Sequence, residues 1–236
     1  MKGIILFVAV FCCIQGNTFA ALKSGKNGAC TQEPRDIFLV VDGSASIGIS
    51  QFESVRQFIL QLIKAVQVHE DYTHFGLLQF SSDDKTKVEF ELDYSHKSNV
   101  LLDKVRSLKY QSGTATKTGS ALDIVEREVF TPEADDRPNV PDYLIIFTDG
   151  QATDRRRAYR VSEKLKRKGV KIVAIGAGRD KFNFLKQLEE IASSPSDVWM
   201  ADFDNLNEIV GVIVKDVVNE ICPEPPPDYI QSVSNC

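Results

Sequence analysis

Short apolar runs alternate with longer amphipathic stretches along most of this chain. Runs such as FLVV at 38–41 and YLIIF at 143–147 are apolar without interruption, which is typical of strands buried on both faces of a sheet. The strands expected on this basis cover residues 37–41, 75–80, 143–147 and 170–175, with a weaker one at 198–201. Apolar residues recur at helical spacing between them, over residues 51–68, 100–108, 119–129, 155–168, 182–192 and 206–221.

Strands that alternate with helices predict an α/β fold. We expect a Rossmann-like open sheet, mostly parallel, with helices on both faces. Residues 87–92 alternate apolar and polar side chains, which predicts one antiparallel edge strand joined to its predecessor by the SSDDK turn. Ligands of such open sheets bind beyond the carboxyl ends of the strands. Asp42 and Asp149 each follow a predicted strand, so both carboxylates are expected at that edge.

The segment DGSAS, residues 42–46, places oxygen atoms at alternate positions. Side chains two residues apart in an extended segment point the same way, so Asp42, Ser44 and Ser46 are expected to converge. The segment SGTATKTGSAL adds further hydroxyls, and Asp149 in FTDG adds a second carboxylate. Hard oxygens without sulfur or imidazole favour Mg²⁺, Mn²⁺ or Ca²⁺ over zinc or copper. The few short side chains favour an octahedral ion that keeps some waters, so we expect Mg²⁺ or Mn²⁺ ahead of Ca²⁺.

Three motifs in this order, Asp-x-Ser-x-Ser, Thr-x-Thr-Gly-x-Ala-Leu and Phe-Thr-Asp-Gly, resemble the von Willebrand factor type A domain and its metal-ion-dependent adhesion site. The resemblance covers about residues 34–222. It implies Ser44 and Ser46 as direct ligands, Asp42 and Asp149 as carboxylates held through water, and Thr116 as a direct ligand of the ligand-bound form.

The resemblance is closer to the A domains of matrilins and non-fibrillar collagens than to collagen-binding integrin domains. The reason is the stretch after Ile175, which passes into the next predicted helix through only a short loop. The resemblance therefore implies an extracellular matrix adaptor that bridges matrix proteins, with collagen among the candidate partners.

A site built from hydroxyls and waters leaves its ion electrophilic, with one position free for a hard oxygen. A glutamate or aspartate of a partner protein fills that position as a charge-assisted contact. The alternative function is a self-assembling structural or mineralising-matrix component with a basic helix, described below, that binds glycosaminoglycan.

Catalysis is a weaker hypothesis than these two binding or structural functions, and a hydrolase is the least favoured function of all. A phosphatase of the haloacid dehalogenase class needs a second aspartate where this chain has Ser44. A serine hydrolase needs Gly-x-Ser-x-Gly and a histidine base. The histidines, His69, His74 and His96, are expected at the amino-terminal edge of the sheet, away from Asp42. We therefore expect that the chain is not an enzyme.

The first twenty residues have the pattern of a secretory signal peptide. Lys2 precedes an apolar run at 4–14, and small residues at 18 and 20 precede the expected cleavage after Ala20. An uncleaved anchor is the alternative; no other run approaches the roughly 20 apolar residues of a spanning helix. The signal peptide, together with the resemblance to matrix proteins, leads us to expect a protein secreted into the extracellular matrix. The net charge of −5 gives no general attraction to nucleic acid. The expected organisation is a signal peptide at 1–20, an N-terminal segment at 21–33, a type A domain at 34–222 and a proline-rich tail at 223–236.

Three cysteines remain after Cys12 and Cys13 leave with the signal peptide. Cys30 and Cys222 bracket the periodic part of the chain, and the ends of a domain often lie close together, so we expect these two to pair outside the cell. Cys236 is then left for a disulfide-linked homo-oligomer or a link to a matrix partner. Pairing of Cys222 with Cys236 is the competing arrangement.

Four basic residues, Arg156, Arg160, Lys164 and Arg167, fall on one side of the helix expected at 155–168. Clustered cations of this kind bind sulfated glycosaminoglycans or other acidic matrix. The other interpretation is an ordinary solvated face, with cations near a helix carboxyl end. From the sequence alone we prefer the solvated face, because charged runs on exposed helix faces are ordinary, and keep polyanion binding as the alternative.

Overall fold

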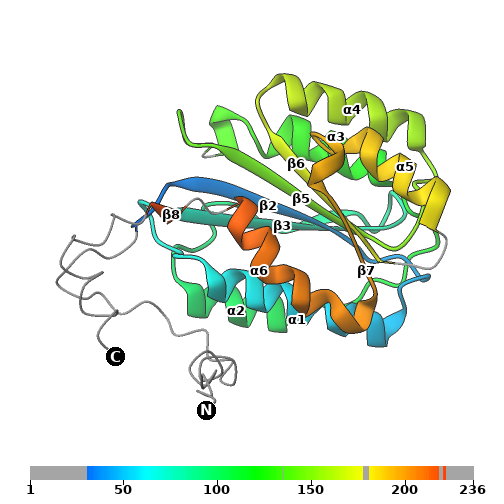
Figure 1. The fold of residues 1–236 in the computed structure, drawn as a ribbon, viewed down its shortest axis with the longest axis horizontal. Helices are drawn as coiled ribbons and strands as arrows, with labels where there is room; N and C mark the ends of the chain where they lie inside the picture. The colour runs from blue at the N-terminus through cyan, green and yellow to red at the C-terminus, as the bar shows by residue number, and fades with distance from the viewer. Residues whose placement is uncertain (1–30, 135, 178–180, 218–219, 222–236) are drawn as a thin grey trace, which may run out of the picture. The chain divides into compact units, whose positions relative to one another are not determined.

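The central sheet of the protein has its strands in the order β4-β3-β2-β5-β6-β7 (Figure 1). The structure is a computed structural model that describes residues 31–134, 136–177, 181–217 and 220–221. The strands of this sheet are β2 (Arg35–Asp42), β3 (Thr73–Phe80), β4 (Lys87–Phe90), β5 (Asp142–Thr148), β6 (Lys171–Ala177) and β7 (Val198–Ala201). Neighbouring strands are parallel except β3 and β4. The predicted α/β fold, with its antiparallel edge strand, is confirmed.

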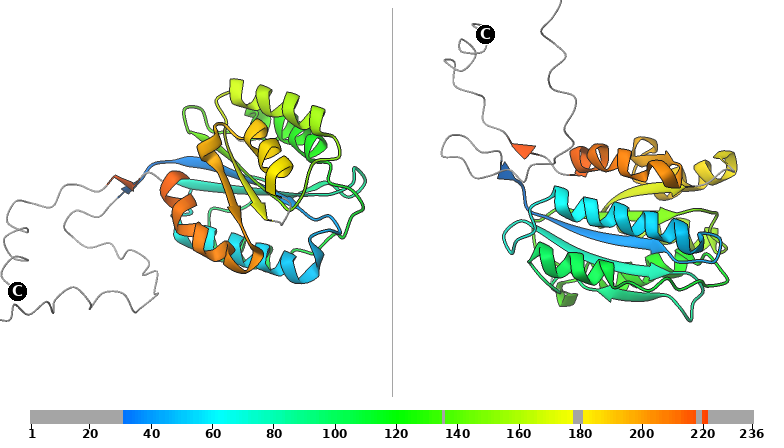
Figure 2. Two further views of the ribbon diagram at one scale, coloured as in Figure 1. Left: turned by 45° about the vertical axis from the view of Figure 1, so that its right-hand side comes forward. Right: turned by 90° about the horizontal axis from the view of Figure 1, so that it is seen from below.

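Helices cover both faces of this sheet (Figures 1 and 2). One face carries α1 (Gly48–Ala65), α2 (Ser98–Arg106) and α6 (Leu206–Val217). The other carries α3 (Thr118–Glu128), α4 (Arg155–Arg167) and α5 (Lys181–Ile191). Short 3₁₀ turns lie at η1 (Pro132–Ala134), η2 (Pro195–Asp197) and η3 (Phe203–Asn205).

The uninterrupted apolar runs of the sequence are explained by this layering. All eight residues of β2 are buried, because the strand is central and has helices above and below it. Alternate side chains of β2 enter separate cores: Leu39 packs on the side of α1, and Val40 packs on the side of α3 and α4. The central strand is therefore fixed from both sides, and it ends at Asp42.

A two-stranded ribbon at the ends of the described chain was not predicted. Strand β1 (Thr31–Gln32) pairs antiparallel with β8 (Glu220–Ile221), so that Thr31 lies opposite Ile221. The helix expected at 206–221 is therefore too long, because α6 ends at Val217. Arg35, 2% exposed at the start of β2, donates a hydrogen bond to the carbonyl oxygen of Val217. These contacts hold the two ends of the domain together.

A buried ion pair closes the amino-terminal edge of the sheet. Asp36 is fully buried in β2, and its Oδ1 accepts hydrogen bonds from Nε (3.0 Å) and Nη2 (2.7 Å) of Arg137. Arg137 also donates to the carbonyl oxygens of Arg35 and Tyr72 at 2.9 and 2.7 Å. One guanidinium therefore joins the starts of two strands to the loop before β5.

The three histidines lie at this same edge, as predicted. His74 is opposite Asp36 in the β2–β3 register, and its ring stacks on His96 with centroids 4.2 Å apart. His69 lies in the loop just before β3 and contacts Tyr72. Within the described residues, no helix is both long and apolar enough to cross a membrane.

Candidate metal centre

Asp42, the last residue of β2, is held rigidly at the carboxyl edge of the sheet. Its side chain is 0% exposed. Oδ1 accepts a hydrogen bond from the backbone N–H of Ser44 at 2.8 Å, and Oδ2 accepts one from the hydroxyl of Thr148 at 2.6 Å. Thr148 is the last residue of the adjacent strand β5, so the parallel register of the two strands places its hydroxyl beside this carboxylate.

The two serines connect this carboxylate to Asp149. The Oγ atoms of Ser44 and Ser46 are 2.9 Å apart, and Ser46 Oγ donates to Asp149 Oδ1 at 3.0 Å. Ser44 is buried and Ser46 is exposed, so the group reaches from the sheet edge to the surface. The structure thus joins Asp42, Ser44, Ser46 and Asp149 in one hydrogen-bonded set, as expected from the strand-end rule.

The loop that carries Thr116 is attached to the same strand end. Ala45 N donates to Gly113 O at 2.7 Å, and Gly113 N donates to Gly43 O at 3.2 Å. A Cβ at Gly113 would lie 1.9 Å from Ser81 Oγ, so only glycine permits this approach. Farther along, Thr116 is 9% exposed.

The hydroxyl of Thr116 has no hydrogen-bond partner among the described residues. Its carbonyl oxygen accepts from Thr153 N at 2.9 Å and Thr153 Oγ1 at 3.2 Å, which fixes the backbone at this point. The structure therefore places Thr116 on the neighbouring loop, not in the hydrogen-bonded set.

Sequence reasoning missed the side chains that support this site from a distance. Tyr110 donates its hydroxyl to Ser44 O at 2.7 Å and accepts from Gly48 N at 3.1 Å. Gln79 holds the following loop through the N–H of Gln111 at 3.1 Å and the carbonyl of Lys109 at 3.0 Å. These contacts join residues 30 or more positions apart, so no local sequence pattern announces them.

Two uncompensated carboxylates make the site ready for a cation. Burial raises the pKa of Asp42 to about 6; hydrogen bonds from Thr148 and Ser44 oppose this, and the charge of Asp149 adds to it. Burial also raises the pKa of Asp149. Neither carboxylate forms an ion pair with a described lysine or arginine, while other acidic side chains of the domain do. The donors are all oxygens, so the residues present fit a hard divalent ion.

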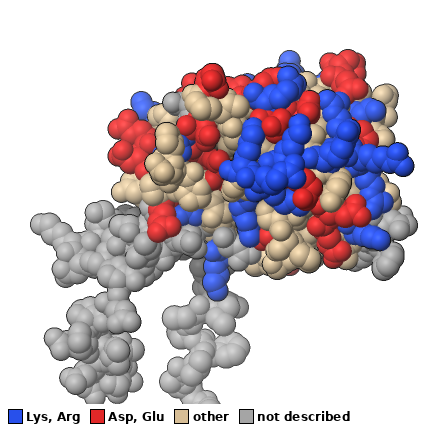
Figure 3. Space-filling model, turned by 90° about the horizontal axis from the view of Figure 1, so that it is seen from above, with Lys and Arg blue, Asp and Glu red and all other residues tan. Residues whose placement is uncertain are grey.

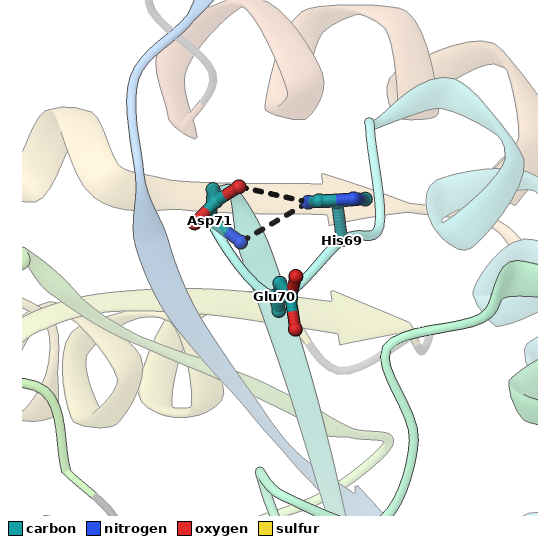
Figure 4. A group of neighbouring side chains, drawn as sticks. All are labelled: His69, Glu70 and Asp71. Atoms are coloured by element: carbon teal, nitrogen blue, oxygen red, sulfur yellow. Dashed lines mark hydrogen bonds and ion pairs between the residues drawn. The ribbon is translucent and has the colours of Figure 1, made fainter.

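Other groups of acidic and histidine side chains lie at the opposite edge. His69, Glu70 and Asp71 are neighbours in one exposed loop (Figure 4). His69 Nδ1 is 3.2 Å from the backbone N of Asp71 and 3.4 Å from its Oδ2. Local turn contacts account for this group. Asp36, Asp136 and Asp142 also lie close together, but Asp36 is already paired with Arg137.

Known proteins resemble this chain in sequence and in fold. Collagen alpha-1(XII) chain of Notophthalmus viridescens is 33% identical over 194 residues, which cover 81% of this chain and 20% of the collagen chain. Matrilin-1 of Mus musculus is 31% identical over 221 residues, covering 92% of this chain and 41% of the matrilin. The chain thus spans well under two thirds of the length of these relatives.

A solved structure of proximal thread matrix protein 1 from the mussel byssus, with a zinc occupied MIDAS motif, shows the same fold. It superimposes with a TM-score of 0.69 at 24% sequence identity, over 78% of this chain and 48% of the mussel chain. The profile of the von Willebrand factor type A domain matches residues 36–212, which include every residue of the candidate metal centre. The chain belongs to the von Willebrand factor type A domain family.

Proposed function

We propose that this protein is a secreted extracellular matrix adhesion protein, not an enzyme, that binds a partner protein through a divalent cation at the candidate metal centre. The observation that carries the proposal is the hydrogen-bonded set of Asp42, Ser44, Ser46 and Asp149, which holds two carboxylates without a counter-charge. The mussel protein solved with a zinc occupied MIDAS motif supports a metal at this kind of site.

The geometry and the family pattern support a role for each residue of the site. Ser44 and Ser46 would hold the ion directly, Asp42 and Asp149 through water, and Thr116 through its unpaired hydroxyl when a partner is bound. Mg²⁺, or Mn²⁺ in its place, supplies a positive charge that accepts a carboxylate oxygen of the partner. The hydrogen bonds from Thr148 and Tyr110 keep these side chains in position without contacting the partner.

An apolar side chain beside the site gives the partner a second kind of contact. Ile49 is 76% exposed in the first turn of α1, three residues after Ser46. An apolar residue packed around a central charged contact excludes water from it and strengthens it. Matrix proteins with an exposed acidic side chain next to apolar surface are therefore the partner class, with collagens among them.

Removal of the metal should abolish this binding. The test is solid-phase binding of the full chain to a panel of matrix proteins, in Mg²⁺ and in EDTA, with Ser44→Ala and Ser107→Ala. Ser107 is an exposed serine at the end of α2, so its variant controls for loss of any hydroxyl. EDTA and Ser44→Ala should each reduce binding to background, while Ser107→Ala should bind like wild type. Binding that survives both would refute the proposal.

The cysteine pairing is a further part of this proposal. Cys30, Cys222 and Cys236 lie outside the described residues, as does the predicted signal peptide. Thr31, which follows Cys30, lies opposite Ile221, which precedes Cys222, in the β1–β8 register. Positions 30 and 222 are the next pair if this register is continued by one residue, and facing positions of two antiparallel strands favour a disulfide between Cys30 and Cys222. Cys236 is then left for covalent assembly with a second copy or a matrix partner.

Peptide mapping of the unreduced protein should recover Cys30 linked to Cys222. Non-reducing electrophoresis should show a dimer or larger species that Cys236→Ser converts to monomer. A peptide that links Cys222 to Cys236 would contradict the pairing, and an unchanged monomer would contradict the assembly.

A further inference from the structure

Helix α4 and the residue after it carry eight basic side chains, which the structure divides into two groups. Four of them form close ion pairs with acidic residues on the neighbouring helices α3 and α5 or on α4 itself. Their partners are Glu190 for Arg155 (2.7 Å), Asp123 for Arg157 (2.8 Å), Glu163 for Lys166 (2.5 Å) and Glu126 for Lys168 (3.0 Å). These cations therefore have a structural explanation.

The other four form the outer row of the helix, here called the basic face: Arg156, Arg160, Lys164 and Arg167. All four are exposed. Among the described residues, none of the three arginines has an ion pair or a side-chain hydrogen bond. Lys164 has only a long ion pair, with its Nζ 3.9 Å from Glu126 Oε2. The opposite side of α4 is buried against the sheet by Ala158, Val161, Ser162 and Leu165, so the basic face points directly outward.

Figure 3 views this side of the molecule and shows lysine and arginine side chains gathered over a continuous area, with acidic side chains mostly around it. Arg156 and Arg160 line an open hollow together with Tyr159, which is 47% exposed. Glu163 also lies toward this side, but Lys166 neutralises it. The positive area exists although the whole chain has a net charge of −5.

The helix macrodipole accounts for only part of the basic face. Cations near the carboxyl end of a helix are stabilising, which explains Lys164 and Arg167. Arg156 lies in the first turn, where the partial positive charge of the helix end disfavours a cation. The helix dipole therefore gives no structural reason for a cation at Arg156.

We propose that the basic face binds a sulfated glycosaminoglycan chain, independently of the metal centre. Arg156 and Arg167 are eleven residues apart, so the row extends about 16 Å along the helix, as a linear polyanion requires. The planar guanidinium group donates two parallel hydrogen bonds to oxyanions such as sulfate. The exposed ring of Tyr159 offers an apolar surface for a sugar ring between two of these cations.

A narrow row fits a polysaccharide better than a membrane. Tyr159 is the one large apolar side chain exposed on α4, so the face has no set of residues to insert among lipid tails. The compartment proposed above also favours matrix polysaccharide over nucleic acid.

The test is surface plasmon resonance of the full chain over immobilised heparin in EDTA, with two triple variants. One variant is Arg156→Ala/Arg160→Ala/Arg167→Ala. The matched control, Lys64→Ala/Lys97→Ala/Lys215→Ala, removes the same charge from exposed lysines of the opposite helical layer that form no ion pair with described residues. The arginine variant should bind about 30-fold more weakly or worse, and the control should stay within about twofold of wild type.

Several outcomes would overturn the proposal. Absence of wild-type binding, equal losses in both variants, or equal binding to heparin stripped of its sulfates would each reject sulfate recognition by this face. Stronger binding to vesicles with about 30% phosphatidylserine, or to RNA, would assign the face to another polyanion. The arginine variant should unfold at about the same temperature as wild type, because the loss of Arg156, which opposes the helix dipole, offsets the loss of Arg167, which the dipole favours. Lost binding at an unchanged unfolding temperature will then not reflect lost folding.

Discussion

Asp42→Asn should reduce Mg²⁺ affinity by about 10- to 100-fold, the usual effect of losing a group that orients metal ligands, and should abolish metal-dependent adhesion. The variant should nevertheless be more stable than wild type when metal is absent. Both effects have one cause, since the buried carboxylate of Asp42 costs free energy until a cation neutralises it.

The structure can accommodate the asparagine without strain. Its Oδ1 can keep the hydrogen bond from Ser44 N, and its Nδ2 can donate to Thr148 Oγ1. The hydroxyl of Thr148 can then donate to Gly150 O, which is already 3.2 Å away. No buried polar group loses its partner in this arrangement, so the change removes a charge and little else.

The metal-free protein should lose stability as the pH rises through the range in which Asp42 ionises. The pKa of Asp42 is about 6 in the folded state and 3.8 in the unfolded reference. Across this interval the folded state holds a proton that the unfolded chain has lost, so stability falls as the pH rises from about 4 to about 6. The advantage of Asp42→Asn should therefore reach at most about 3 kcal/mol near pH 7.5 and be about half as large near pH 5.

Urea unfolding at both pH values and calorimetric titration with Mg²⁺ measure the two effects. Asp103→Asn is the matched control, because Asp103 is 74% exposed on α2 and loses the same charge. It should change neither quantity. An Asp42→Asn protein that binds Mg²⁺ normally, or that is less stable than wild type without metal at pH 7.5, would contradict the account.

Arg137→Ala should lower the free energy of unfolding by about 3–5 kcal/mol, because it leaves the carboxylate of Asp36 buried without its partner. The guanidinium also bonds the carbonyl oxygens of Arg35, Tyr72 and Glu70, so its loss separates the starts of β2 and β3 from the loop before β5. The effect should appear as a lower urea midpoint with an unchanged slope.

Arg127→Ala provides the comparison, since Arg127 is 55% exposed and pairs with Asp123 and Glu128 on the surface. Its cost should stay below about 1 kcal/mol. The double variant Asp36→Asn/Arg137→Met should recover much of the loss, because it removes both charges together. If Arg137→Ala and Arg127→Ala cost the same, the buried pair does not stabilise this edge.

The sequence predicted the sheet and the candidate site for related reasons. Buried parallel strands must be apolar along their whole length, so β2, β5 and β6 were recognisable as uninterrupted runs. Asp42 and Asp149 could be assigned to the site because each lies at the carboxyl end of a predicted strand. This assignment needs no knowledge of side-chain contacts.

The remaining features depend on contacts between distant parts of the chain. Thr148 and Tyr110 support the site across 106 and 66 residues, and either would read locally as an ordinary strand or loop residue. A helical projection of α4 shows the row of cations, but only packing against α3 and α5 separates the paired arginines from the free ones. The ribbon of β1 and β8 has two residues in each strand, too few for any periodicity.

That ribbon has a mechanical consequence. β1 and β8 hold the first and last described residues side by side, and the Arg35–Val217 contact lies just inside them. These contacts lie at the start of β2, about 23 Å from Asp42 at its far end. A tensile load applied through the two ends therefore enters at neighbouring points and passes across the ribbon, bypassing the six-stranded sheet. The sheet edge that carries the candidate metal centre therefore lies outside the path of this load. The disulfide proposed between Cys30 and Cys222 would carry the load ahead of the ribbon.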